Sequence, residues 1–363
     1  MADYTLQFPG PSGFLNGIDS SGQAVGATFI PDGEFSQSTP ARWPAPYAED
    51  VIELAAGSLL SQFFRANSNG YAIGFFGGTN VIAYKFEPGS GPDVPVIAPT
   101  TIPGLVADIN DNNQILLGDG SIYQIEPDNT ATLNPVLIPA GATCRGINNN
   151  GFVVGNLADG TPFLFSTVEV IYLPFNCSLF DINDNLLAVG YSAGLPVYID
   201  LSLPAAQWSV TLIPLPASPA AVSGGGGDTW MAVNNSGVIV GNVATTGTGM
   251  QSGYPFVYYG PTKKGGAPAS PGSALNLNGQ VLGGGAPYLL NARDINDSGV
   301  IVGNCNLDTF TGYVATPFPG AIRIDWPLTE MLETIRLWMA YEKAGVARTE
   351  ALIERLAKTI DIK

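Results

Sequence analysis

The sequence contains no histidine, and only 12% of its 363 residues are charged. Histidine is the commonest general base and the commonest metal ligand in proteins, so its absence disfavours much hydrolytic chemistry and most zinc chemistry. Cysteine is also scarce: Cys144, Cys177 and Cys305 form no CxxC pair. We expect all three to be small core residues, with at most one disulfide between two of them.

The chain also lacks an apolar run that approaches the ~20 residues of a membrane span. Its first residues show neither the basic nor the apolar region of a signal peptide. We therefore expect a protein that is made in the cytoplasm and stays soluble unless it is exported or released by another route.

Positive charge is rare in residues 1–320, which hold 7 Lys and Arg against 23 Asp and Glu, whereas residues 321–363 hold 7 of each. The whole net charge of -16 therefore belongs to the first part of the chain. Such an acidic body repels phosphate backbones and anionic membranes, which argues against nucleic acid and membranes as partners.

Glycine and proline are abundant, with 45 and 29 copies, as is typical of short strands joined by tight turns. One phrase also recurs: an apolar residue, Asn or Asp, two residues that are mostly small or polar, Gly, three residues, and a final Gly. Its eight copies begin and end at residues 18–26, 66–74, 109–118, 147–155, 182–190, 233–241, 275–283 and 295–303. Self-similarity at this spacing predicts an array of small units that stack to bury their apolar faces.

Each phrase predicts a β-hairpin. Asn before a turn can bond its own backbone, and Gly three residues later can take a left-handed conformation. Two copies have another residue at that turn position, Asn113 and Leu186. Asn tolerates the left-handed conformation and Leu does not, so we expect a different turn at Leu186. The final Gly is expected where backbones crowd together.

Third strands are predicted at residues 162–165, 196–199 and 255–258, and fourth strands at 135–139, 170–174 and 210–214. Four short strands per unit, with continuous apolar runs in the second, predict an all-β fold, a β-propeller. The copy at 275–283 is followed by the next after only 20 residues, which leaves the number of blades at seven or eight.

The last copy has a third strand near residues 312–315 but no fourth. Residues 4–9 resemble the fourth strands of other units. We expect this N-terminal strand to pair into the last blade, which closes the ring and protects an open edge.

The phrase at residues 147–155, followed by residues 162–165, resembles the HAF-type extracellular repeat of bacterial proteins. The His-Ala-Phe segment of that family appears without histidine, for instance at residues 40–43. The resemblance covers residues 4 to 316 and implies a propeller-like fold, and the family implies no established catalytic residues.

The composition changes from Pro327, where Gly and Asn give way to Leu, Met, Glu, Arg and Ala. The spacing of apolar residues predicts a C-terminal α-helical hairpin, so the domains are expected at 1–320 and 321–363. The two helices could cover each other and the propeller rim, or dock onto another subunit, and we favour docking. The residues expected to dock are Leu328, Met331, Leu332, Ile335, Trp338, Met339, Leu352 and Leu356.

Residues 108–112, 181–185 and 294–299 resemble the start of a calcium-binding EF-hand loop, in which oxygens at alternate positions converge on the ion. None has the bidentate Glu at the twelfth position, and Asp and Asn also suit a hairpin turn. We therefore expect turns, with no cofactor. A glycoside hydrolase needs two acids ~5 to 10 Å apart, and nothing in the sequence pairs them.

Five aromatic residues could stack on sugar rings. Trp43 and Tyr258 fall on third strands, so we expect them in the core. Tyr47, Trp230 and Tyr259 lie nearer loops and are the candidate ligand-binding residues.

Together these features predict a non-enzymatic structural or binding propeller that is displayed on a larger assembly. We expect the surface of a bacteriophage particle, on its capsid or tail, with the C-terminal helices as the anchor and lysis as the route of release. The first alternative is a bacterial propeller that binds carbohydrate or recognises a surface. A glycan-active enzyme is the second.

Overall fold

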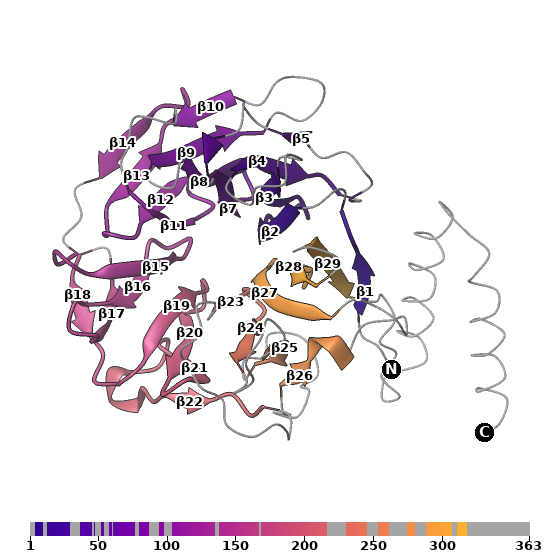
Figure 1. Ribbon diagram of the computed structural model, residues 1–363. Coiled ribbons are helices and arrows are strands. Elements are labelled where there is room, and N and C mark those ends of the chain that lie inside the picture. The colour runs from indigo at the N-terminus through magenta and orange to yellow at the C-terminus, as the bar shows by residue number, and fades with distance from the viewer. Residues whose placement is uncertain are drawn as a thin grey trace, which may run out of the picture.

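The protein is a seven-bladed β-propeller in a computed structural model (Figure 1). The structure describes residues 4–9, 13–29, 37–45, 47, 52–53, 58–59, 61–76, 80–86, 94–97, 104–134, 138–166, 168–215, 230–244, 253–260, 274–279, 288–306 and 311–317. Each blade is an antiparallel sheet whose innermost strand lies nearest the axis of the ring.

The strands are grouped by their position in the blade, from the first blade to the seventh. The innermost strands are β2 (Gly13–Ile18), β7 (Gln62–Ala66), β11 (Val106–Ile109), β15 (Thr143–Ile147), β19 (Ser178–Ile182), β23 (Met231–Val233) and β27 (Leu289–Ile295). The second strands are β3 (Ala24–Phe29), β8 (Tyr71–Phe76), β12 (Gln114–Leu117), β16 (Val153–Asn156), β20 (Leu187–Ser192), β24 (Val238–Ala244) and β28 (Ile301–Cys305).

The third strands are β4 (Gln37–Trp43), β9 (Asn80–Lys85), β13 (Ile122–Ile125), β17 (Pro162–Phe165), β21 (Leu195–Asp200), β25 (Gly253–Tyr259) and β29 (Thr311–Pro317). The outer strands are β5 (Ile52–Glu53) with β6 (Ser58–Leu59), β10 (Val94–Ile97), β14 (Ala131–Asn134), β18 (Val170–Tyr172), β22 (Thr211–Leu212), β26 (Leu275–Asn276) and β1 (Tyr4–Gln7). Two short 3-10 helices complete the described elements, η1 (Ala205–Gln207) and η2 (Leu277–Gly279).

Seven of the eight phrases form the hairpin between an innermost and a second strand, as predicted. The copy at residues 275–283 does not, because Leu275 and Asn276 pair with β25 as the outer strand of the sixth blade. The Asn278 side chain then accepts a hydrogen bond from the Leu289 N–H at 2.7 Å and donates one to the Leu289 carbonyl at 3.1 Å. Asn and Gly serve turns of many kinds, so this segment imitates the repeat without forming a blade, and the blade count is seven.

The N-terminal strand closes the ring, which confirms the prediction. β1 pairs with β29 from Tyr4 opposite Pro317 to Gln7 opposite Val314, and the two strands lie side by side in Figure 1. Tyr4 is only 1% exposed. The seventh blade is thus built from both ends of the propeller, so the ring has no unpaired edge at its seam.

Most predicted third and fourth strands are confirmed, with one exception in the third blade. Its outer strand is Ala131–Asn134, not residues 135–139. A tight turn in which the Glu126 N–H donates to the Thr130 carbonyl at 2.8 Å returns the chain at once, so pairing with β13 begins earlier than the apolar run suggests.

The turn at Leu186 is the same as in the other repeats, so the expectation of a different turn is wrong. Leu186 has φ 60° and its N–H donates to the Asn183 carbonyl at 3.0 Å, as Gly151 does to Asn148. Its side chain packs against the apolar cluster between the fourth and fifth blades.

The crowding expected at the final glycines of the phrases is confirmed. A Cβ on Gly26, Gly74 or Gly190 would lie 1.9 Å from a carbonyl oxygen of the neighbouring strand.

Apolar side chains from adjoining blades fill the space between the sheets. In one cluster Val189 and Tyr191 of the fifth blade meet Ile239 and Phe256 of the sixth. Trp43 and Tyr258 are 2% and 3% exposed, which confirms both as core residues. The three cysteines are buried and unbridged.

Within the described part of the chain, no helix has the length and apolarity needed to cross a membrane. The predicted C-terminal helical hairpin, and the domain boundary at residue 320, lie outside the described residues.

Candidate functional site

The innermost strands surround a central channel that contains a cavity of about 150 Å³. The ends of these strands and the hairpin turns that follow them supply its lining. Three positions of each phrase contribute to it: the residue before the apolar start, the Asn or Asp after that apolar residue, and the next residue along the turn.

A β-bulge sets the first position. In every blade except the sixth, the register between the innermost and second strands shifts by one residue just before it, for example between Leu179 and Asp181. A bulge bends the strand and re-aims the side chains around it. The residues at this position form what we call the carboxylate layer, and from the first blade to the seventh they are Gly17, Arg65, Asp108, Gly146, Asp181, Ala232 and Asp294.

Each aspartate of the carboxylate layer joins its own blade to the next one. One oxygen of Asp108 accepts the N–H of Ile109, and the other accepts the N–H of Ile147 in the fourth blade, both at 2.9 Å. Asp181 bonds Ile182 and Val233 in the same way, at 2.8 Å each. Both oxygens of these side chains are therefore used by backbone N–H groups.

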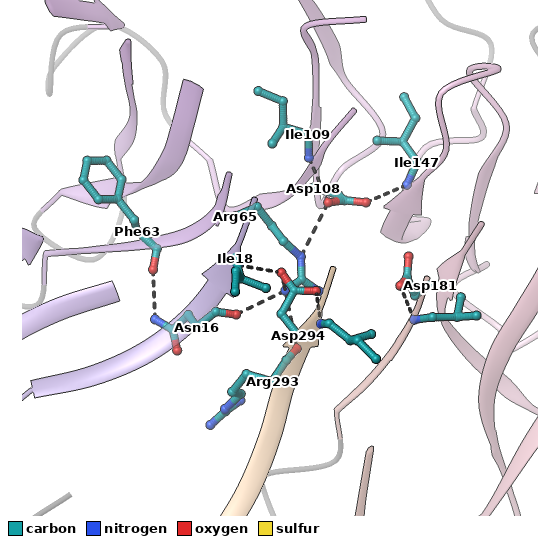
Figure 2. A network of polar contacts seen from close by, with 12 residues as sticks. Asn16, Ile18, Phe63, Arg65, Asp108, Ile109, Ile147, Asp181, Arg293 and Asp294 are labelled. Atoms are coloured by element: carbon teal, nitrogen blue, oxygen red, sulfur yellow. Dashed lines mark hydrogen bonds and ion pairs between the residues drawn. The ribbon is translucent and has the colours of Figure 1, made fainter. Parts of the chain in front are cut away.

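Asp294 completes the pattern at the seam of the ring. It bonds Ile295 at 2.9 Å and Ile18 of the first blade at 3.0 Å (Figure 2). The blades that follow an aspartate have Gly or Ala in the layer. At Gly146 the reason is space, because a Cβ there would lie 2.8 Å from the Cα of Asp181. Aspartate and small residues thus alternate around the channel.

Because seven is an odd number, the layer position of the second blade has no place in this alternation. Arg65 occupies that position. Its Nε lies 3.5 Å from an oxygen of Asp108, and its Nη1 lies 3.4 Å from an oxygen of Asp294. Nη1 also donates to the Asn16 carbonyl at 3.2 Å. A single side chain therefore connects the second blade with the third, the seventh and the first.

The charges of this layer do not balance, because one guanidinium faces three carboxylates. The side chains of Arg65, Asp108 and Asp294 are only 8%, 12% and 14% exposed. Burial raises the pKa of Asp108 from its ordinary 3.8 to about 7 and that of Asp181 to about 6, although Arg65 acts in the opposite direction. Burial raises the pKa of Asp294 as well. In these carboxyls desolvation outweighs the one available cation.

The second position forms a ring of asparagine amides. Each side chain donates from Nδ2 to the main-chain carbonyl of its counterpart in the next blade, at 2.9 to 3.0 Å. The donors are Asn67, Asn110, Asn148, Asn183, Asn234 and Asn296. The first blade has Asp19 instead, which accepts the Gln23 N–H at 2.8 Å but has no amide to donate, so the ring has one gap.

At the third position, Asp and Asn alternate from the third blade to the seventh, and the first two blades have Ser20 and Ser68. From the third blade to the sixth, the backbone N–H at this position donates to the side chain of the counterpart in the next blade, at 2.7 to 2.9 Å. Asn149 and Asn235 each bridge two carboxylates through Nδ2. The alternating residues are Asp111, Asn149, Asp184, Asn235 and Asp297.

Among the residues that the structure describes, no three His, Cys, Asp or Glu side chains gather as a metal-binding group. The aspartates of the three EF-hand-like segments instead accept hydrogen bonds from backbone and amide N–H groups.

The three candidate ligand-binding aromatics lie apart. Tyr47 has φ 65° and its hydroxyl donates to the Gly22 carbonyl. Trp230 lies just before β23, with Arg65 and Arg293 over its ring at 4.9 and 5.8 Å. Tyr259, at the end of β25, is 36% exposed, and its hydroxyl lies 3.2 Å from that of Tyr4. The eight predicted docking residues, from Leu328 to Leu356, lie outside the described residues.

Sequence reasoning missed Arg65 and treated the channel aspartates only as turn formers. The signal was available, because the residue before each phrase alternates between Asp and a small residue, and Arg65 breaks this order. What the sequence did not show was that these positions from different repeats meet at one axis.

Comparisons with known proteins identify the class through the fold alone. No family model matches the chain, and no curated protein matches it. Among solved structures 147 chains match. One is a chain of the crystal structure of a mitotic checkpoint complex, with a TM-score of 0.51, 10% identity, and coverage of 87% of this chain and 94% of that one. At this identity the likeness shows a shared propeller architecture, which hosts many activities.

Asp19→Asn is expected to stabilise the protein by about 1 kcal/mol, because the new amide keeps the bond to Gln23 and can donate to the Asn67 carbonyl. The matched control is Asn183→Asp, which removes the same kind of amide from an intact position and should cost about 1 to 3 kcal/mol. Urea unfolding of the variants measures both. A loss of stability in the first variant, or no loss in the second, would contradict the role of the ring.

The free energy of unfolding is expected to fall as pH rises from about 4 to about 7. Asp108 and Asp181 hold protons in the folded state at pH values where the unfolded chain has released them, because burial raises each pKa above 3.8. Asp128 and Asp159 have lowered pKa values, so their contribution is lost only as pH falls below that range.

Urea unfolding midpoints measured across this range test the dependence. Asp181→Asn should flatten it, since one of the buried titrating groups is then gone. A midpoint that rises steadily from pH 4 to pH 7 would show that the buried carboxylates do not dominate.

Proposed function

We propose that this propeller is a non-enzymatic structural or binding component of a larger assembly, namely a surface protein on the capsid or tail of a bacteriophage particle. The observation that carries the proposal is the use of the channel polar groups. The three aspartates of the carboxylate layer have both oxygens bonded to backbone N–H groups of two blades. Acids used in this way hold a ring together rather than attack a substrate.

The closure of the ring supports attachment at one blade of the propeller, the seventh. Because Tyr4 pairs with Pro317, the chain after β29 continues from the blade that also holds the N-terminal strand. Residues 321–363, with their predicted helices, would then anchor the propeller beside its seventh blade. The apolar residues from Leu328 to Leu356 would bind the neighbouring subunit.

A second surface of the propeller also suits contact with protein. Large apolar side chains are exposed along the outer strands and adjoining loops of the third to fifth blades, which follow one another around the rim in Figure 1. They are Leu133, Val168, Tyr172, Leu203 and Leu212. Apolar side chains that recur on neighbouring elements are typical of interaction surfaces.

Fewer structural observations support the carbohydrate-binding alternative. Of its three candidate residues, Tyr259 has an exposed ring, whereas the ring of Trp230 is covered by two arginines. We therefore place the assembly role first.

Full-length variants with a charge in the predicted apolar stripe test this role. We expect Leu332→Asp and Trp338→Asp to leave the propeller folded, by circular dichroism, and to release it from particles. Glu333→Gln, in the same segment but outside the stripe, is the control. Sedimentation of lysates from cells that make the protein, with immunodetection, measures the particle-bound fraction.

The wild-type chain and the control should sediment with particles, and both aspartate variants should remain in the supernatant. A wild-type chain that sediments as a single polypeptide, or charged variants that stay on the particles, would exclude the proposed anchor.

A further inference from the structure

Arginine is concentrated on the innermost strands. Residues 1–320 contain only four arginines, and three of them lie on innermost strands: Arg65 on β7, Arg145 on β15 and Arg293 on β27. The same part of the chain has 23 acidic residues. Arg65 is paired with Asp108 and Asp294, so its place is explained, whereas that of Arg145 is not.

Arg145 sits at the bulge of the fourth blade, between buried Cys144 and Gly146 of the carboxylate layer. Its guanidinium carbon lies 4.5 Å from the centre of the Phe180 ring on the next innermost strand. The side chain is partly exposed, and within the described residues it has no hydrogen bond and no ion pair. Burial lowers the pKa of Arg145 from its ordinary value, as expected of a cation that no carboxylate offsets.

The contact with Phe180 orients the guanidinium without using its donors. A guanidinium over an aromatic ring interacts with the π face, whereas its N–H groups can form hydrogen bonds to a partner elsewhere. Those N–H groups match the two oxygens of a carboxylate, or two oxygens of a sulfate or phosphate, in a bidentate contact. Phe180 is itself held edge-on by Tyr191 at 5.7 Å, so the platform is fixed.

Arg293 occupies the corresponding bulge of the seventh blade. It lies over Trp230, as Arg145 lies over Phe180, with a distance of 5.8 Å from its guanidinium carbon to the ring centre. In Figure 2 its side chain extends away from Asp294 and the other carboxylates. The four successive blades from the fourth to the seventh thus supply Arg145, Phe180, Trp230 and Arg293.

We propose that this part of the channel wall is a binding site for an oxyanion, a carboxylate or a sulfate or phosphate group, with Arg145 as the residue that holds it. This goes beyond the assembly role and does not depend on it. The carboxylate layer lies on the side of the hairpin turns and is filled by its own hydrogen bonds. At the bulge of the fourth blade, by contrast, Arg145 presents a guanidinium that is already oriented by Phe180.

Isothermal titration of the full-length protein tests the site, with three probes at constant ionic strength set by chloride: sodium sulfate, sodium acetate and sodium galacturonate. We expect millimolar binding of at least one probe. Arg145→Gln should weaken it at least about tenfold, which corresponds to the loss of one charge-assisted contact. Sulfate binding as tight as carboxylate binding indicates a site for the oxyanion alone. Galacturonate binding tighter than acetate binding indicates a ligand whose carboxylate is attached to a sugar ring.

The matched control is Arg42→Gln. Arg42 also lies over an aromatic ring, 4.7 Å from Phe86, but it donates to Gln23 at 2.7 Å and is outside the channel. It should leave binding unchanged. Arg145→Lys keeps the positive charge and should bind carboxylate about tenfold more weakly, because an ammonium cannot donate two parallel bonds. The proposal is overturned if wild-type protein binds none of the probes, or if the Arg145 variants bind as well as wild type.

Discussion

The hydrogen bonds between neighbouring innermost strands are the interaction on which the ring depends. Each aspartate of the carboxylate layer spans two blades, and each asparagine of the amide ring, two residues further along the chain than the layer position, does the same. The alternation of aspartate and small residues in the carboxylate layer closes completely only for an even number of blades. With seven blades, one position of the layer has no counterpart. Arg65 fills that position, because its several donors reach three other blades. The cost is a buried layer with more negative than positive charge.

The repeat predicted the hairpins, the strand order and the closure by residues 4–9, because each of these depends on local turn chemistry and edge pairing. The blade count needed the structure, since Asn278 and Gly279 belong to a 3-10 turn that has the same residue types as a hairpin. Leu186 was misjudged because packing against its neighbours offsets the strain of a left-handed conformation. The channel could not be predicted at all from one repeat, since Asp108, Asp181 and Asp294 become neighbours only when the ring closes.

The position after each bulge and the bulge itself make different kinds of contact between the blades. The residues that follow each bulge join the blades, so changes there act on the whole ring. Two of the bulged residues, Arg145 and Arg293, lie over the aromatic rings of Phe180 and Trp230 in neighbouring blades.

The coupling between Arg65 and Asp294 tests the dependence of the ring on this layer most directly. A double-mutant cycle of Arg65→Met and Asp294→Asn, read as free energies of urea unfolding, isolates it. We predict that Arg65→Met alone costs about 3 to 5 kcal/mol, because it leaves buried carboxylates without their cation, and that the coupling energy is at least about 1 kcal/mol. Additive effects, with a loss below about 0.5 kcal/mol for Arg65→Met, would show that apolar packing alone holds the seven blades together.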